Sequence, residues 1–230
     1  MRLPAANPDA GRVAAGSIRE AALKPLFQSS WSRAWHGLRA QGDGLALRNA
    51  VLAAYAEPHR RYHTAQHLEE CLSLFESVRD APDRPAEVEM ALWFHDAVYE
   101  LQGGENEARS AAWVREELLK AGVALGTAAT VHDLVLVTRH TAAPRTRDER
   151  VLVDIDLAIL GASEPRFVEY ERQIREEYAQ VPERLFRLKR REILQSFLDR
   201  SKIYSTPSLH QQLEARARTN LTHAVAANAA

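Results

Sequence analysis

Apolar residues recur at the spacing of an α-helix through most of this 230-residue chain. Residues 64–79 show the pattern clearly, because Leu68, Leu72 and Phe75 fall on one helical face while Glu69 falls on another. A face of this kind must be buried against other helices. The periodicity therefore favours a protein built from helices that pack on one another.

Strands are not expected. The β-branched runs at 131–137 and 151–155 lack the hairpin turn or alternating partner that a sheet needs. Ten Gly and ten Pro make up about 4% of the chain each, and Gly is well below the roughly 7% of average proteins. So few turn formers argue against a sandwich or barrel of many short strands. The sequence therefore predicts an all-α fold.

We expect one helical domain at residues 23–228, preceded by a flexible tail at residues 1–22. The tail mixes Pro, Gly, Ala and Asn without periodicity, and no repeat or linker divides the rest of the chain. Nine or ten helices are predicted, at 31–40, 45–57, 64–79, 85–99, 106–120, 127–140, 152–160, 165–179, 183–200 and 207–226.

The charge balance and the single cysteine bear on where such a chain works. Thirty Lys and Arg against thirty-one Asp and Glu leave a formal net charge of −1, so general binding to nucleic acid or to a membrane surface is not expected. No apolar run approaches the roughly 18 residues of a membrane helix, and residues 1–17 lack the apolar stretch of a secretory signal, so we do not expect one. Cys71 has no intrachain partner, which fits a reducing compartment. These features predict a soluble, cytoplasmic protein and leave its oligomeric state open.

The first chemical anomaly is the pair His95-Asp96 inside the apolar helix expected at 85–99. A helix that is apolar on nearly every face is buried, and burying an imidazole beside a carboxylate is costly unless each has a strong partner. A divalent cation is such a partner, because it binds neutral imidazole and ionised carboxylate together. For the dipeptide alone, a hydrogen-bonded core histidine with Asp96 as a cap is the alternative.

His63 and His67 lie four residues apart at the start of the helix expected at 64–79. If the helix begins by His63, the two share one face at the spacing of two zinc-protease ligands, although the Glu between those ligands is missing here. If it begins at Thr64, only His67 is well placed as a ligand, and His63 is free to donate a proton. A surface cluster of histidines is the third interpretation of this motif taken alone.

Two carboxylates, Asp154 and Asp156, interrupt a third apolar segment at 152–160. Asp154 can be explained as a helix N-cap, whereas Asp156 lies deeper in the run and is harder to explain in that way. The chain thus places two histidines and two aspartates in three separate apolar helices, in the order His, His-Asp, Asp. That combination is more specific than any of its members.

This order and its local contexts resemble the HD superfamily of metal-dependent phosphohydrolases, all-α proteins named for an adjacent His-Asp pair. The wider chain looks like a bacterial group of predicted HD phosphohydrolases in its segments Arg61-Tyr62-His63, His67-Leu68, 91–96, Asn106-Glu107, Ser110-Ala111, Asp156-Leu157, Leu160-Gly161 and 214–221. The resemblance implies that His67, His95, Asp96 and one late aspartate hold a divalent metal. We assign the late ligand to Asp156, with Asp154 as the alternative.

The resemblance also implies catalytic roles for three residues. The histidine pair at 63 and 67 looks like that of cyclic-nucleotide phosphodiesterases, in which the first His protonates the leaving oxygen, so His63 is the expected general acid. Asp96 is expected to orient the attacking water as well as to bind metal. Several HD enzymes place a further His between the pair and the last Asp, where it binds a second metal or contacts substrate. His140 fits that position.

Other polar residues near these motifs have ordinary explanations beside functional ones. Glu107 suits the first turn of a helix, and the resemblance suggests that it lines the site or orients a ligand. Arg139 is expected to be a better contact for a phosphate group than the arginines of the helix at 183–200, because it is nearer the proposed metal. A second pair, His132-Asp133, falls in the first turn of the helix expected at 127–140, where an acidic side chain complements the helix dipole, so we expect it to be structural.

The resulting hypothesis is metal-dependent hydrolysis of a phosphate ester or anhydride in a small phosphorylated substrate, with a nucleotide as one option. Such ligands suit Mn, Fe, Zn, Co or Ni, with Mg also considered, at one or two ions per chain. Two alternatives stay open. One is a di-iron oxygenase on the same scaffold, which would use His63 and His140 as further ligands. The other is a non-enzymatic binding module in which metal stabilises the helices.

Overall fold

The computed structural model describes residues 24–101 and 103–228, which form ten α-helices and one short 3-10 helix. This confirms the prediction of an all-α protein with nine or ten helices. The predicted tail at 1–22 lies outside the described residues. The elements are α2 (Pro25–Gly37), α3 (Leu45–Ala54), α4 (Ala65–Val78), α5 (Pro85–Phe94), α6 (Asn106–Lys120), α7 (Leu125–Val137), α8 (Arg147–Asp156), η1 (Leu157–Gly161), α9 (Glu164–Glu177), α10 (Glu183–Leu198) and α11 (Pro207–Ala227).

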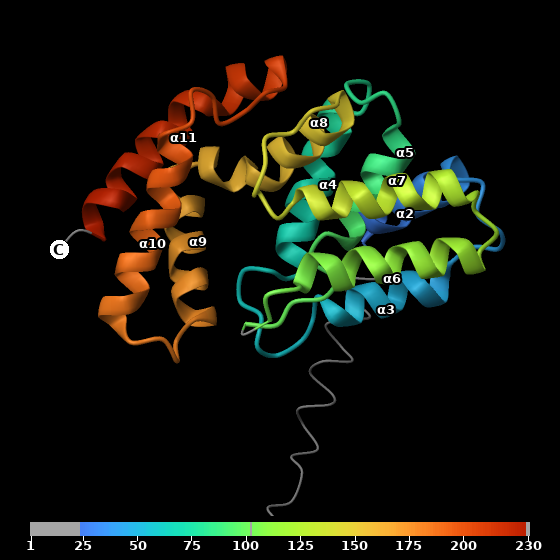
Figure 1. The fold of residues 1–230 in the computed structure, drawn as a ribbon, viewed down its shortest axis with the longest axis horizontal. Coiled ribbons are helices and arrows are strands. Elements are labelled where there is room, and N and C mark those ends of the chain that lie inside the picture. The colour runs from blue at the N-terminus through green and yellow to red at the C-terminus, as the bar shows by residue number, and fades with distance from the viewer. Residues whose placement is uncertain (1–23, 102, 229–230) are drawn as a thin grey trace, which may run out of the picture.

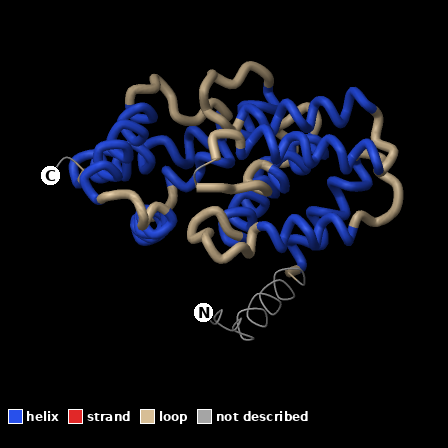
Figure 2. Tube along the Cα trace, turned by 60° about the horizontal axis from the view of Figure 1, so that its bottom comes forward, coloured by secondary structure: helices blue, strands red, loops and turns tan. Residues whose placement is uncertain are grey.

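The helices form two groups that α8 and η1 join (Figure 1). In the N-terminal group, α2 to α7, α5 packs against α2, α4, α6 and α7. In the C-terminal group, α9 to α11, α10 packs on α11, and both α9 and α11 contact η1. Loops and turns connect the helices over the described ranges (Figure 2), and none of the described helices is both long and apolar enough to cross a membrane.

Helix α5 lies at the centre of the core because it has no polar face to turn toward water. Every residue from 88 to 94 is buried, including the charged Glu89, whose carboxylate pairs with Arg33 of α2. The Trp93 indole contacts Trp31 edge-on, with ring centroids 5.0 Å apart, and donates a hydrogen bond to the Ser30 hydroxyl at 3.0 Å. Burial of these rings fixes the position of the whole helix.

The helix predicted at 85–99 ends five residues early, at Phe94, so His95 and Asp96 lie in the turn that follows it. The reason is a competing set of partners for the backbone. The Arg60 guanidinium donates to the carbonyls of Asp96, at 2.6 Å, and Ala97, at 3.0 Å, and the Val98 N–H donates to the Ser110 hydroxyl. In a continuing helix, two consecutive side chains would point about 100° apart. The turn frees the side chains of His95 and Asp96 from that constraint.

Helix α8 begins at Arg147, five residues before the predicted start, because Thr146 and Glu149 form a capping box. Asp154 therefore lies inside the helix, and its interpretation as an N-cap of this segment is wrong. Its fully buried carboxylate accepts the backbone N–H groups of Ser205, at 2.9 Å, and Thr206, at 2.5 Å, just before α11. Asp154 thus joins α8 to the start of the last helix.

Further contacts between η1 and α11 hold the end of α8, and with it Asp156, in place. The side-chain amide of Asn220 donates to the carbonyls of Leu160, at 2.8 Å, and Ala162, at 3.0 Å. Gly161 lies so close to α11 that a Cβ atom there would stand 2.7 Å from the Cβ of Leu213. Glycine is needed at this position because the two elements touch along their backbones.

Candidate metal centre and active site

Side chains from three separate elements converge on one point in the buried centre. His67 lies in the first turn of α4, His95 and Asp96 follow α5, and Asp156 ends α8. The Nε2 atoms of His67 and His95 are 3.0 Å apart. Asp96 Oδ2 is 3.1 Å from His95 Nε2 and 3.5 Å from His67 Nε2, and Asp156 Oδ1 is 3.5 Å from both. The structure therefore brings together the four residues that the sequence singled out as metal ligands.

These separations match the spacing of ligands around one cation. Two atoms bound at about 2.1 Å to the same ion lie roughly 3.0 Å apart in octahedral geometry and roughly 3.4 Å apart in tetrahedral geometry. The five nitrogen–nitrogen and nitrogen–oxygen distances of the cluster fall between 3.0 and 3.5 Å. The donor set, two imidazoles and two carboxylates, thus fits a divalent metal ion.

Hydrogen bonds on the far side of both imidazoles leave the converging nitrogens available as ligands. His95 Nδ1 donates to the Leu92 carbonyl at 2.8 Å, which requires the lone pair of the neutral ring to be on Nε2. The hydroxyl of the buried Tyr62 lies 3.0 Å from His67 Nδ1 and can accept a hydrogen bond from its N–H group. Outer partners of this kind orient metal-binding histidines in proteins.

The charges of the cluster are mutually dependent. Burial lowers the pKa of His95, but the carboxylates of Asp96 and Asp156 outweigh that effect and raise the pKa to about 9. For Asp96, burial raises the pKa, but the nearby His95 and His63 bring it well below its usual value. The pKa of Asp156 is lowered in the same way, chiefly by its hydrogen bonds to His140 and His67, against the effect of burial. Both carboxylates are thus ionised beside the histidines, and a positive charge next to them stabilises that state.

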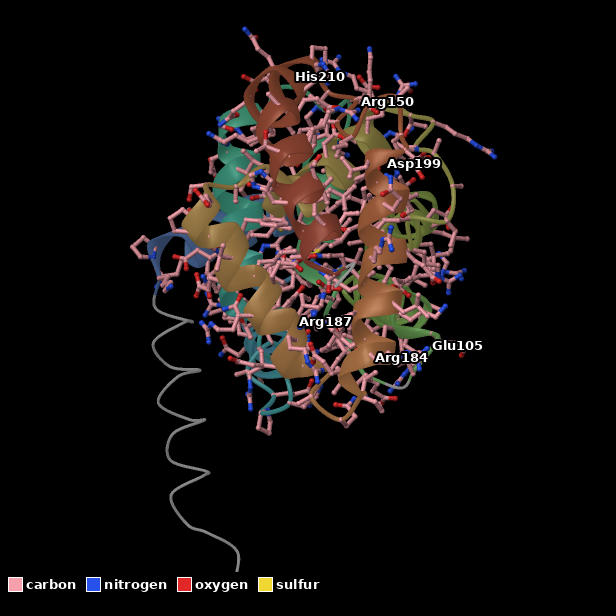
Figure 3. The ribbon with its side chains drawn as sticks, turned by 90° about the vertical axis from the view of Figure 1, so that its left-hand side faces the viewer. Glu105, Arg150, Arg184, Arg187, Asp199 and His210 are labelled. Carbon is pink, nitrogen blue, oxygen red and sulfur yellow. The ribbon has the colours of Figure 1, made fainter. Side chains whose placement is uncertain are left out.

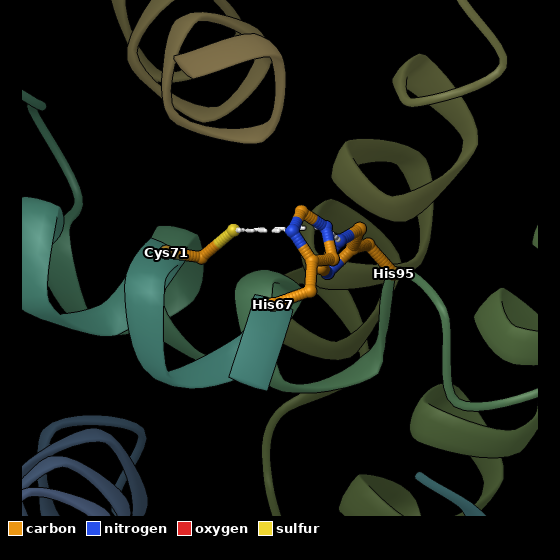
Figure 4. Close-up of side chains that lie close together, drawn as sticks. All are labelled: His67, Cys71 and His95. Atoms are coloured by element: carbon orange, nitrogen blue, oxygen red, sulfur yellow. Dashed lines mark hydrogen bonds between the residues drawn. The ribbon is translucent and has the colours of Figure 1, made fainter. Parts of the chain in front are cut away.

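Cys71 adds a sulfur atom beside the two histidines (Figure 4). It lies one helical turn after His67, and its Sγ is 3.7 Å from His67 Nδ1 and 3.8 Å from His67 Nε2. Ligand atoms of His67, Cys71 and His95 lie within 4.8 Å of one another, so this buried group could hold a metal ion. Burial raises the pKa of the Cys71 thiol well above its usual value, which disfavours the thiolate that metals bind.

His63 lies outside α4, in the loop before the Thr64 N-cap, and it makes a pair of its own. Its Nδ1 lies 2.8 Å from Oε2 of Glu177, and Glu177 Oε1 accepts the backbone N–H groups of residues 61, 62 and 63. The ring stacks on Tyr99 with centroids 4.0 Å apart. The alternative in which the helix begins by His63 is therefore wrong, and only His67 of the two points its ring into the cluster.

Glu177 is a residue of this site that the sequence did not indicate. It stands at the end of the charged helix α9, where glutamates are ordinarily solvated, yet it is only 2% exposed. Burial raises its pKa, but the hydrogen bond and charge of His63, with the backbone N–H groups, lower it to about 2. Glu177 is thus ionised at neutral pH and fixes a proton on His63 Nδ1. His63 Nε2 has no hydrogen-bond partner in the described part of the chain.

His140 reaches the cluster from the loop after α7, because that helix ends at Val137 and not at residue 140 as predicted. Its Nε2 lies 2.9 Å from Asp156 Oδ2, the oxygen that does not face the two histidine ligands. The backbone of His140 has φ +55°, in the left-handed region that non-glycine residues seldom adopt. Such a conformation persists only where the surroundings enforce it. His140 is therefore held against the proposed ligand Asp156.

Arg60 is a second site residue that the sequence did not single out. Besides the carbonyls of Asp96 and Ala97, its buried guanidinium donates to the carbonyl of His63 at 3.1 Å. One side chain thereby ties the His63 loop to the turn that carries His95 and Asp96. Neighbouring prolines and arginines give no sequence signal that this arginine is buried.

Three other candidate residues lie apart from the cluster. Asp154 binds the start of α11, so the cluster contains Asp156 and not its alternative. Glu107 and Arg139 face each other, with 3.9 Å between Oε2 and Nε, and among the described residues neither bonds to one of the four converging side chains. The second pair, His132-Asp133, is bonded within itself at 2.8 Å on the outside of α7.

A cavity of about 550 Å³ adjoins the cluster. His63, His140 and Asp156 contribute to its lining, together with residues of η1, α9 and α10. Of the four converging side chains, Asp156 is the one that lines this cavity, so a small molecule in it would meet the cluster at Asp156, beside the two histidines outside the ligand set.

Comparison with known proteins finds no matching family model, no similar curated protein and no similar solved structure. The resemblance to the HD superfamily therefore stays a prediction from the residues themselves. The geometry of the site has to support any functional proposal on its own.

Proposed function

We propose that this chain is a metal-dependent phosphohydrolase that cleaves a phosphate ester or anhydride. The observation that carries the proposal is the convergence of His67 Nε2, His95 Nε2, Asp96 Oδ2 and Asp156 Oδ1 at distances of 3.0 to 3.5 Å. These four residues would hold the ion, and the mixed donor set suits Mn, Fe, Zn, Co or Ni better than Mg, which prefers oxygen ligands.

A divalent cation in such a site supplies Lewis-acid polarisation of a phosphoryl oxygen and lowers the pKa of water. Asp96 has a second carboxylate oxygen and is partly exposed, so it can accept a hydrogen bond from the attacking water and orient it. Asp156 is held by His140 through its outer oxygen, which keeps its inner oxygen directed at the histidines.

His63 supplies the proton for the leaving group. Ionised Glu177 fixes the Nδ1 proton, so the exchangeable proton is at Nε2, on a ring that lines the cavity. A histidine oriented by a buried carboxylate is a common arrangement for general acid–base catalysis. Tyr99, whose ring stacks on His63 and whose hydroxyl donates to Glu177 at 3.1 Å, restricts the imidazole to this orientation.

The two alternatives draw less support from the geometry. A di-iron oxygenase needs His63 and His140 as ligands, but the ring centroid of His63 lies 6.2 Å from that of His67, whereas the ligand atoms of the cluster lie 3.0 to 3.5 Å apart. A purely structural metal would require no cavity at the cluster and no histidine–glutamate pair beside it. Hydrolysis uses both features.

The test is phosphate or nitrophenol release by the full-length protein, stripped of metal and then loaded separately with each of the candidate ions. Aryl phosphomonoesters, aryl phosphodiesters and nucleotides serve as substrates. We expect turnover that requires metal, that a chelator abolishes, and that His67→Gln removes while the fold is kept. Turnover unaffected by chelator, or oxygen-dependent turnover with two irons per chain, would contradict the proposal.

A further inference from the structure

The cavity beside the cluster differs in chemistry from the cluster itself. Its walls come from η1, α9 and α10 and are mostly aliphatic or aromatic, with Leu160, Ile174, Phe186 and Phe197 among the lining residues. Its ionisable groups close to the cluster are His63, His140 and Asp156, which already have roles in the site. At about 550 Å³, the cavity has the size of pockets that enclose small organic ligands.

The one buried cation of the cavity wall is already neutralised. The Arg190 side chain pairs with Glu171 and lies over the Tyr170 ring at 4.9 Å, and it is only 7% exposed. Arg184 and Arg187, labelled near one end of α10 in Figure 3, are not part of the lining, and Arg187 pairs with Glu183 at 2.7 Å. The other cation of the lining, Lys189, is exposed and pairs with Glu192 at 2.8 Å. A polyphosphate or the polar edges of a nucleobase would therefore find few unpaired partners along these walls, and burying them unpaired is unfavourable.

Apolar side chains also stand exposed where α10 borders the cavity. Leu185 and Ile193 line it and are each 48% exposed. Leu188, on the same helix, is 53% exposed but does not line the cavity. Two half-exposed aliphatic residues on the cavity wall suit a ligand whose apolar part covers them.

Resting on the function proposed above, we infer that the substrate is a phosphate ester whose leaving alcohol carries an alkyl or aryl group, and that this group occupies the cavity. His63, the proton donor to the leaving oxygen, lines the same space, so the alcohol extends from the cluster into it. Water attacks phosphorus and keeps one proton as the new phosphate hydroxyl, while its other proton is released to solvent. The bond between phosphorus and the alcohol oxygen breaks, the His63 proton passes to that oxygen, and His63 then takes up a proton from solvent. The products are inorganic phosphate and an apolar alcohol.

The test uses metal-loaded, full-length protein and a series of n-alkyl phosphates from ethyl to octyl, each below its critical micelle concentration. Their leaving groups are nearly equal in acidity, so chain length changes burial and little else. Full burial of a methylene contributes up to about a fourfold gain. We expect kcat/KM to rise at least 30-fold from ethyl to octyl phosphate, and to be at least tenfold lower for a nucleoside monophosphate than for octyl phosphate.

Two variants of exposed residues check where the chain binds. Leu185→Gln with Ile193→Gln is expected to reduce the octyl-to-ethyl ratio of kcat/KM at least fivefold. Leu188→Gln is the matched control on the same helix and is expected to keep the wild-type ratio. A flat dependence on chain length, a preference for nucleotides, or equal effects of the double variant and the control would overturn the inference while leaving the proposed hydrolysis intact.

Failure of hydrolysis itself has a different signature. If no ester is cleaved with any metal, the proposed function is wrong, and calorimetry with methyl-, butyl- and octylphosphonate decides the fate of the cavity assignment. Affinity that rises with chain length and falls in the double variant would uphold an apolar ligand with an anionic head. Equal affinity for the three phosphonates, or none, would overturn it.

Discussion

The chain carries two His-Asp pairs, one in the turn after α5 and one on α7. The two helices pack against each other, yet the surroundings of the two pairs are opposite. His95 is 1% exposed and Asp96 19%; His95 meets side chains of α4 and α8, and Asp96 meets His67 of α4. Asp133 is 76% exposed, and its carboxylate bonds to its own neighbour, His132. The same dipeptide thus forms part of a converging cluster in one place and a solvated surface in the other. Burial and long-range partners, not the motif, separate the two.

The sharpest way to break this comparison is to neutralise one carboxylate in each pair. Asp96→Asn removes a charged ligand and the orienting oxygen for water, so we expect phosphohydrolase activity to fall about a thousandfold, or roughly 4 kcal/mol of transition-state stabilisation. Asp133→Asn should change activity less than twofold. Metal content and kcat/KM of both purified variants give the answer. Comparable losses in the two variants would show that the buried pair has no special role.

Arg60 provides the next test, because its hydrogen bonds hold the turn that carries the buried His-Asp pair, whereas the exposed pair on α7 has no such support among the residues that the structure describes. Arg60→Ala leaves the carbonyls of His63, Asp96 and Ala97 without their donor in the protein interior. We expect the free energy of unfolding to fall by about 3 kcal/mol. Arg61→Ala, which removes an exposed guanidinium next to it in sequence, should cost less than about 0.5 kcal/mol. Urea denaturation measures both, and a small loss for Arg60→Ala would contradict the bracing role.

The fold and the four converging residues could be predicted from the sequence, but the groups that position those residues could not. Helical periodicity is a local property, so the presence of the helices was predictable, although the predicted bounds of α2, α5 and α8 were wrong by five or six residues at one end. The apolar surroundings of His95 and Asp156 marked both as anomalous. The end of α5 at Phe94 was missed because it depends on Arg60, which is 36 residues from Asp96. Glu177 was missed because a glutamate on a charged helix reveals its burial only when α9 has packed against the His63 loop.

The buried carboxyl of Glu177, paired with His63, and the exposed carboxyl of Asp133 should also differ in how they affect stability at acid pH. Because the pKa of Glu177 is lowered from 4.5 to about 2, its ionisation stabilises the fold above pH 4.5, and this contribution disappears as pH falls toward 2. The full effect is roughly 3 kcal/mol. We expect the stability difference between wild type and Glu177→Gln, in metal-free protein, to shrink by most of that amount between pH 5 and pH 2.5. Asp133→Asn serves as the matched control for loss of an exposed carboxyl. A constant difference across the range would argue against an ionised, buried Glu177.

The smallest expected effect concerns Cys71, which tests which donors define the buried centre. Its thiol lies farther from His67 Nε2 than either carboxylate oxygen does, 3.8 Å against 3.5 Å, and burial raises its pKa well above the usual range. If His67, His95, Asp96 and Asp156 are the ligands, Cys71→Ala should change metal affinity less than about threefold. It should lower the free energy of unfolding by about 1 kcal/mol through lost packing. Co²⁺-loaded wild-type protein should show no thiolate charge-transfer absorption. A thiolate band, or metal loss in Cys71→Ala with metal retained in Asp96→Asn, would instead assign the ion to the two histidines and the sulfur. Metal binding by the carboxylate would then no longer distinguish the buried His-Asp pair from the exposed one.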